Sequence, residues 1–251
     1  MNRNMKSKLK VEDFDGIDQI ASRIWVSRST IKKGLNRPIY RYMSFEHLLS
    51  MLSNQELFFS NRKSFSDRRE SGAIFDLKTD LTLNIVERNK KIKEQRKKKY
   101  SRVREAAKSI CISCWTFGNN TAKEDYLMWK TYNSENVTCR IETTIEDLIH
   151  CLLPQDDYDI IISDVSYSNM IIESANNYIF NKSIYYSSEK ELRMCVLSKN
   201  DYVKLRINLF AFIKEVILSP FISREFSRFL INQLRIPYPT IPVCMSRILE
   251  D

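Results

Sequence analysis

The sequence has few histidines and few glycines. His47 and His150 are the only two histidines in 251 residues, which argues against a histidine-based catalytic triad or a metal centre with several histidine ligands. The four glycines form no glycine-rich phosphate-binding loop. No apolar run approaches the length that crosses a bilayer, and no apolar signal core follows the basic first residues. We therefore expect a cytoplasmic protein with no membrane partner.

Six cysteines lie mostly within apolar, strand-like segments, as small buried side chains do in a reducing compartment. Cys111 and Cys114 have the spacing of two zinc ligands. A strand would turn these two thiols to opposite faces, and the sequence holds neither a second such pair nor a spaced pair of histidines. We expect no metal cofactor.

The net charge of +9 is concentrated in one segment. Residues 88–104 carry ten lysines and arginines and one glutamate, while the rest of the chain holds 30 basic and 30 acidic residues. Such a basic arm could contact a phosphate backbone, an acidic partner or only solvent. If the partner is nucleic acid, the candidate contacts are Lys97, Lys98, Lys99 and Arg102.

Hydrophobic periodicity predicts a mixture of helices and strands without regular βαβ units. We expect an α+β fold in which surrounding helices and one long basic helix, at about residues 76–108, accompany a central mixed, mostly antiparallel sheet. Residues 1–36 are predicted to form an N-terminal extension with a helix that begins at Phe14 and ends before Gly34, and residues 37–251 a single domain. Strands are expected at 39–42, 57–60, 109–116, 137–141, 160–167, 191–197, 202–207, 216–218 and 243–248, and the remaining helices at 44–54, 124–132, 144–153, 171–180 and 221–236. The strands at 191–197 and 202–207 are expected to be able to pair.

The segment at residues 185–196 concentrates charge at the start of a strand. Alternation predicts that Glu189, Glu191 and Arg193 lie on one face of the strand. That face could be a solvated sheet edge, since edge strands are commonly protected by charge. Alternatively, two carboxylates and a guanidinium face a cleft.

Six short motifs, taken in order, resemble the bacterial family catalogued as domain of unknown function 2971. They are Tyr40-Arg41-Tyr42, Phe58-Phe59-Ser60, Phe65 to Glu70, Cys111-Ile112-Ser113, Leu127 to Tyr132, and Glu189 to Arg193. The chain departs from the family pattern at Ser66 and Arg68 of the Phe-Asn-Asp-Pro turn and lacks the glycine that usually follows the Trp-x-x-Tyr helix. Members often lie near mobile elements and phage-defence genes, so the resemblance implies, by association, a defence or toxin role and a partner protein encoded nearby.

The order of Arg41, Ser113 and Glu189/Glu191 also resembles ADP-ribosyltransferases, and this resemblance implies NAD as a cofactor and nucleic acid or protein as the acceptor. Glu191 would then stabilise positive charge on the ribose, and Glu189 would orient or deprotonate the acceptor. Arg41 would hold the pyrophosphate. The other candidate cofactor-binding residues are Ser113, Trp129, Tyr132 and Arg193.

Two other classes of function stay open. A metal-dependent nuclease could use Asp67, Glu70, Glu124 or Asp125 with magnesium. A non-catalytic antitoxin or sensor could instead pair Glu189, Glu191, Arg41 and Arg193 in a structural ion-pair network. An open cleft between Arg41 and Glu191 would favour the transferase, four clustered carboxylates would favour the nuclease, and buried mutual pairing would favour the non-catalytic protein.

Overall fold

The computed structural model describes residues 9–61, 110–118, 124–133, 138–152, 157–168 and 179–248. The predicted basic helix at 76–108, including Lys97, Lys98, Lys99 and Arg102, lies outside the described residues. So do Asp67, Glu70 and most of the helix predicted at 171–180.

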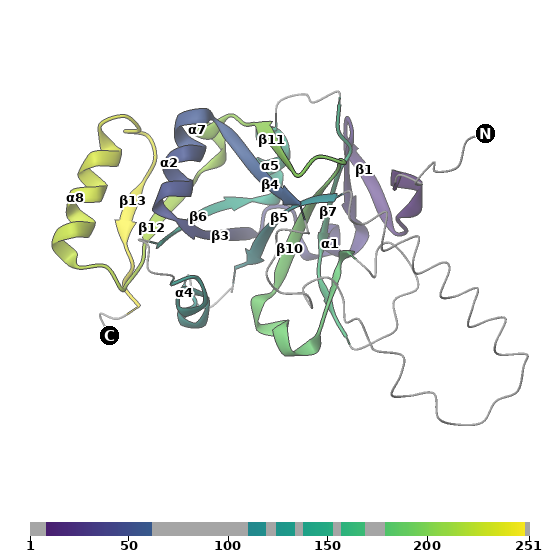
Figure 1. The fold of residues 1–251 in the computed structure, drawn as a ribbon. Helices are drawn as coiled ribbons and strands as arrows, with labels where there is room; N and C mark the ends of the chain where they lie inside the picture. The colour runs from purple at the N-terminus through teal and green to yellow at the C-terminus, as the bar shows by residue number, and fades with distance from the viewer. Residues whose placement is uncertain are drawn as a thin grey trace, which may run out of the picture.

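An eleven-stranded sheet forms the centre of the fold (Figure 1). Nine strands follow the order β1-β2-β7-β10-β5-β3-β6-β12-β13, while β4 pairs with β5 and with β11. Most pairs are antiparallel, and β2–β7 and β12–β13 are parallel. The predicted α+β class with a mixed, mostly antiparallel sheet is therefore confirmed. The strands are β1 (Ile17–Ala21), β2 (Ile24–Ser27), β3 (Pro38–Ser44), β4 (Glu56–Asn61), β5 (Ile110–Phe117), β6 (Thr138–Thr144), β7 (Ile160–Asp164), β10 (Glu191–Leu197), β11 (Tyr202–Arg206), β12 (Glu215–Leu218) and β13 (Val243–Met245).

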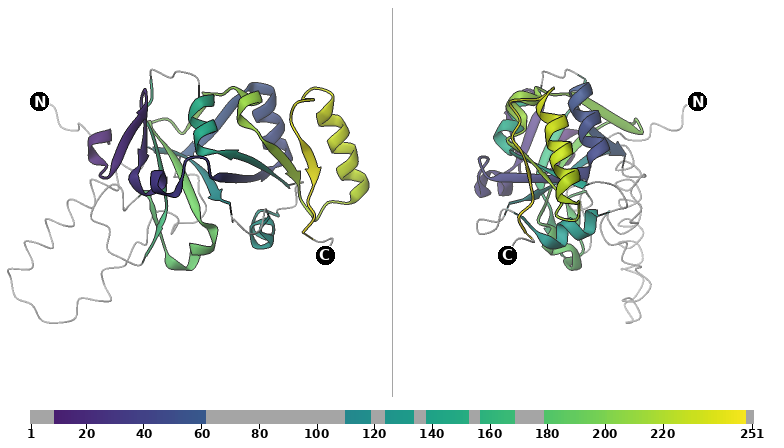
Figure 2. Two further views of the ribbon diagram at one scale, coloured as in Figure 1. Left: turned by 180° about the vertical axis from the view of Figure 1, so that it is seen from behind. Right: turned by 90° about the vertical axis from the view of Figure 1, so that its left-hand side faces the viewer.

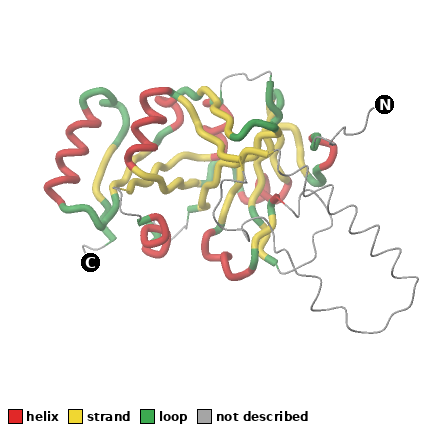
Figure 3. Tube along the Cα trace, in the orientation of Figure 1, coloured by secondary structure: helices red, strands yellow, loops and turns green. Residues whose placement is uncertain are grey.

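Helices cover the sheet and its ends (Figures 2 and 3). α8 packs beside β13 at one end of the molecule, and the β1–β2 hairpin lies at the other (Figure 1). A separate small sheet pairs β8 (Ser166–Tyr167) with β9 (Asn181–Lys182). The helices are η1 (Val11–Asp13), α1 (Arg28–Lys33), α2 (Phe45–Asn54), α4 (Tyr126–Tyr132), α5 (Ile145–Cys151), η3 (Ile184–Glu189), α7 (Leu209–Phe212) and α8 (Arg224–Arg235).

Side-chain caps fix where several helices begin, at the predicted start for α2 and α5 and three residues after it for α8. The hydroxyl of Ser44 accepts a hydrogen bond from the backbone of His47 at the start of α2. Thr144 does the same for Asp147 at the start of α5, and Ser223 for Phe226 at the start of α8. Each cap satisfies a backbone N–H that the first helical turn leaves without a partner.

The helix predicted from Phe14 to before Gly34 is helical only at its end, as α1, and is wrong for the residues before Arg28. This segment forms the β1–β2 hairpin, and β2 joins the main sheet beside β7. Gly16 and Arg23 both have positive φ, at 68° and 56°, and backbone in that region interrupts a right-handed helix. The apolar positions at helical spacing serve as strand residues instead. The domain boundary at residue 36 stays a prediction.

The predicted strands at 191–197 and 202–207 do not pair with each other. β10 lies between β5 and β7, and all seven of its residues are buried. β11 alternates exposed and buried residues and pairs with β4. A strand buried along its whole length needs a partner at both edges, so β10 takes the sheet interior.

Glu189 does not share the strand of Glu191 and Arg193, contrary to the expected alternation. It ends the 3-10 helix η3, and Lys190 then takes a left-handed conformation with a φ of 45° before β10 begins at Glu191. The chain therefore turns sharply between the two glutamates, and Glu189 approaches Glu191 from a different backbone direction.

Candidate functional site

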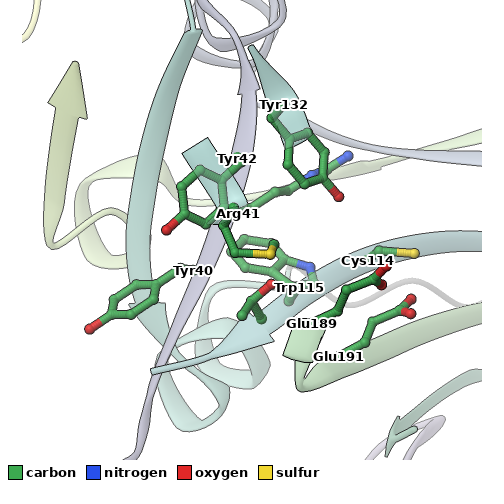
Figure 4. A pocket seen from close by; sticks show the side chains of 10 residues that line it. Tyr40, Arg41, Tyr42, Cys114, Trp115, Tyr132, Glu189 and Glu191 are labelled. Atoms are coloured by element: carbon green, nitrogen blue, oxygen red, sulfur yellow. The ribbon is translucent and has the colours of Figure 1, made fainter. Parts of the chain in front are cut away.

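A pocket lies where β3, β5, α4 and the start of β10 come together (Figure 4). Its free volume is about 20 Å³, close to that of one water molecule. It unites residues that the sequence separates by about 150 positions. They are Tyr40, Arg41, Tyr42, Cys114, Trp115, Thr116, Met128, Tyr132, Glu189 and Glu191.

Arg41 contributes a guanidinium that no described carboxylate pairs with. Its Nη2 donates one long hydrogen bond, 3.5 Å, to the carbonyl oxygen of Phe58. Its guanidinium carbon also lies 5.7 Å from the centre of the Trp115 ring, a cation–π distance. Burial lowers the pKa of Arg41, against the opposing effects of Cys114 and Tyr132. A partly buried cation with weak partners is suited to binding an anion.

Glu191 is held in one orientation at the start of β10. Its side chain is 5% exposed, and Arg193 donates two hydrogen bonds to it, Nε at 2.7 Å and Nη2 at 3.1 Å. Burial acts to raise the pKa of Glu191, but the charge and hydrogen bonds of Arg193, together with Lys182, outweigh burial and hold the pKa below its usual value. Glu191 is therefore a buried carboxylate that stays ionised at neutral pH.

Glu189 lies beside Glu191 and keeps contact with solvent (Figure 4). Its side chain is 26% exposed, and its Oε2 accepts a hydrogen bond of 2.6 Å from Nζ of Lys182. Lys182 is itself buried and lies 3.6 Å from Glu191 as well. One lysine on β9 thus offsets the repulsion between two neighbouring carboxylates.

The two residues of α4 that were predicted to stack on a ligand ring differ in their exposure. Trp129 is fully buried, donates from its indole Nε1 to Glu124 at 3.0 Å, and packs edge-on against Tyr42. It therefore belongs to the core. Tyr132 is 42% exposed and stacks on Tyr42, with ring centres 5.7 Å apart. Burial raises the pKa of Tyr42 to about 12, so Tyr42 is an uncharged support for the Tyr132 ring at neutral pH.

Ser113 and Arg193 are buried and do not line the pocket. The Ser113 hydroxyl accepts a hydrogen bond of 3.2 Å from the indole of Trp115. Arg193 uses its guanidinium for Glu191 and for the carbonyl oxygen of Ile179, at 2.6 Å. Both residues support side chains of the pocket, and neither presents a free group to it.

The described carboxylates of the nuclease alternative have structural partners. Glu124 accepts hydrogen bonds from Trp129, from the hydroxyl of Ser246 and from the backbone of Arg247. Asp125 caps the start of α4. Within the described ranges, no three His, Cys, Asp or Glu side chains gather as metal ligands, and none of the helices has the length and apolar character that a bilayer crossing requires.

Sequence reasoning missed Lys182 and most of the aromatic lining. Tyr40 and Tyr42 flank Arg41 on β3. Strand alternation places their side chains on the face opposite Arg41, so alternation alone could not assign all three to one pocket. Cys114, Trp115 and Thr116 line the pocket from β5, one to three positions along from the predicted Ser113. Lys182 precedes Glu189 by seven residues, and nothing in the sequence distinguishes it from other lysines.

Comparisons with known proteins give fold-level similarity at most. No family model matches the chain, so the resemblance to the domain of unknown function 2971 is not confirmed, and no curated protein matches it. Two solved structures of DarT from Thermus sp. 2.9 are similar. The complex with ADP-ribosylated ssDNA has 10% identity and a TM-score of 0.37, and covers 84% of this chain and 95% of DarT. The complex with NAD+ has 9% identity and a TM-score of 0.37, and covers 84% and 96%. Similarity this low carries no argument about function.

Proposed function

We propose that this pocket binds NAD and transfers its ADP-ribosyl group, which makes the chain an ADP-ribosyltransferase-like enzyme. One observation carries the proposal: Arg41 has no described carboxylate partner, although it shares a pocket with Glu189 and Glu191. The two glutamates pair with Lys182 and Arg193 instead and keep their charge in place. The pocket therefore offers both a cation and fixed anions, which matches a ligand with an anionic pyrophosphate and a positively charged nicotinamide.

NAD supplies an ADP-ribosyl group with nicotinamide as the leaving group, and cleavage develops positive charge on the ribose. Glu191 stays ionised in a low-dielectric setting, where a fixed negative charge stabilises such a transition state strongly. Arg193 keeps the Glu191 carboxylate in position, so little reorganisation is needed. Glu189 is the more exposed acid and is placed to orient or deprotonate an acceptor, which we propose is nucleic acid or protein.

Entry of NAD requires that the pocket widen, because a free volume of about 20 Å³ admits only a small molecule. Tyr132 is the side chain best suited to move. It is exposed, it ends α4, and its ring rests on Tyr42 by stacking. Rotation of Tyr132 would open the pocket beside Arg41 without disturbing the buried ion pairs.

The experiment is release of nicotinamide from NAD by the purified chain, with transfer of labelled ADP-ribose to DNA, RNA or protein as a second measurement. Glu191→Gln is expected to slow release by at least about 100-fold, the size of effect seen when one fixed charge-stabilising group is removed. Glu225→Gln, on the exposed face of α8, is the matched control and should retain activity. Unchanged release in a folded Glu191→Gln protein, shown by circular dichroism, would refute the proposal.

A non-catalytic role is the second candidate, and the ion-pair network favours it. Arg193 and Lys182 already satisfy the Glu191 carboxylate inside the protein. In that case no NAD turnover would occur, and Glu191→Gln would lower stability only. We propose that the chain, as a transferase or as a non-catalytic protein, acts in a defence or toxin system with a partner protein encoded nearby. If the chain is a toxic transferase, its expression should arrest growth and Glu191→Gln should relieve the arrest.

A further inference from the structure

The outer face of β4 and β11 carries two stacked aromatic rings in solvent. Phe58 and Tyr202 are 43% and 55% exposed, and their ring centres lie 5.7 Å apart at an interplanar angle of 24°. In the antiparallel register, Lys204 lies opposite Phe58, and Tyr202 lies opposite Ser60. The rings are therefore diagonal neighbours, fixed by the sheet rather than by a flexible loop. Their faces are available to a third flat ring.

The same face carries two cations, Lys204 and Arg206, and one carboxylate, Glu56. Tyr202, Lys204 and Arg206 alternate with buried residues along β11 and so point the same way. Lys204 pairs with Glu56 at 3.2 Å, and both side chains are partly exposed, so this ion pair is weak and exchangeable. Arg206 is exposed and lies opposite Glu56 in the register, but the ion pair of Glu56 is with Lys204. An anionic ligand that carries flat rings complements this combination.

The strand register relates this face to the pocket, although the residues between them, Ile112 and Cys195, are buried. Ser60 lies opposite Ile112 of β5, and Ile112 lies opposite Cys195 of β10. Residues directly opposite each other share a face, and so do residues two apart on a strand. Phe58 is two positions from Ser60, and Glu191 is four positions from Cys195. Phe58 and Glu191 therefore start from the same face of the sheet. Tyr40 lies opposite Thr116, and Thr116 lies opposite Glu191, so Arg41 starts from the other face. Its Nη2 reaches the carbonyl oxygen of Phe58.

We propose that the β4–β11 face binds single-stranded nucleic acid, whose bases stack on Phe58 and Tyr202 while Lys204 and Arg206 contact the phosphates. Stacking on exposed aromatic rings combined with backbone cations is the general chemistry of single-strand binding. A duplex keeps its bases stacked on each other and cannot use the rings. As the acceptor site, this face rests on the proposed transferase function, but binding itself requires no NAD.

The experiment measures fluorescence anisotropy of a labelled, short, mixed-sequence DNA strand with the full-length chain, without NAD. Tyr202→Leu and Phe58→Leu are each expected to weaken binding about tenfold, while Tyr202→Phe keeps the ring and should bind normally. Phe226 and Phe229 form a second exposed stacked pair, with centres 6.1 Å apart on α8. Phe229→Leu is the matched control and should have no effect. Arg206→Gln should reduce the dependence of log affinity on log salt by about one.

Three results would overturn the proposal. They are unchanged binding by Tyr202→Leu, equal binding of the same strand when annealed to its complement, and equally effective competition by a poly-glutamate peptide, which has charge but no rings. The transferase fails separately: strand binding that depends on Tyr202, without nicotinamide release, would leave this surface established and refute the enzyme. Nicotinamide release together with strand binding that does not depend on Tyr202 would support the enzyme and refute this binding surface.

Discussion

Glu191 is a buried acid whose charge is stabilised by two buried cations rather than by water. Arg193 and Lys182 lie 2.7 Å and 3.6 Å from it, and all three side chains are almost fully enclosed. Removing one member of such a group leaves an uncompensated charge in a low-dielectric interior. The individual residues of this group therefore affect stability as well as the proposed chemistry.

Arg193→Gln is expected to lower the free energy of unfolding by about 3–5 kcal/mol, because it leaves the Glu191 carboxylate without its bidentate partner. Urea denaturation measures this change. Combining Arg193→Gln with Glu191→Gln should recover part of the loss, since the buried anion is then removed too. A loss below about 1 kcal/mol for Arg193→Gln would show that Glu191 is solvated.

The same contacts give a pH dependence of stability. The pKa of Glu191 is lower in the folded chain than the ordinary value of 4.5, so folding favours its ionised form. This contribution is complete above pH 4.5 and is lost as the pH falls through the folded-state pKa. Wild-type protein should therefore lose unfolding free energy faster than Glu191→Gln below that pH, as measured by denaturation at successive pH values. Parallel curves for the two proteins would contradict the lowered pKa.

At the scale of single residues, sequence reasoning identified the residue types of the pocket better than their exact positions. Arg41, Tyr132, Glu189 and Glu191 do come together. Ser113 shares a face of β5 with the lining residue Trp115 but lies beneath the Trp115 indole, and strand alternation does not show which residue along a face reaches a pocket. The burial of Trp129 and the position of Lys182 beside the two glutamates depend on contacts between distant segments. The sequence therefore predicted neither.

At the scale of elements, Gln55 ends α2 in a left-handed conformation with a φ of 53°. Glycine adopts this conformation without the steric cost that a β-carbon brings. Gln55→Gly is expected to raise the free energy of unfolding by about 0.5–1 kcal/mol, measured by urea denaturation. Gln55→Val, which adds a branch at the β-carbon, should lower it, and a stabilising valine would contradict the strained cap.

Helix ends with a local cap were predictable, whereas strand pairing was not. Ser44 and Thr144 mark the starts of α2 and α5 through contacts three residues away, which a sequence displays directly. The β1–β2 hairpin depends on parallel pairing with β7, more than 130 residues along the chain. Its apolar positions fit a helix equally well, so only this distant partner decides between the two structures.

At the scale of the whole molecule, β10 occupies the interior of the sheet and carries Glu191 at one end. Hydrogen exchange followed by mass spectrometry should find its amides among the slowest, because they exchange only when the sheet opens. Amides of β11 should exchange faster, since this strand is half exposed. Equal rates for the two strands would contradict the sheet order described above.

Calorimetric titration of NAD into the full chain tests the role of the pocket most directly. Arg41 makes only a long hydrogen bond to Phe58 and a cation–π contact with Trp115, so Arg41→Gln should change the thermal stability little and weaken NAD binding at least about tenfold through loss of a charge-assisted contact. Arg235→Gln, an exposed arginine in the last turn of α8, should bind NAD as the wild type does. Wild-type protein that gives no binding heat with NAD, or Arg41→Gln that binds NAD as tightly as the wild type, would contradict the assignment of this pocket.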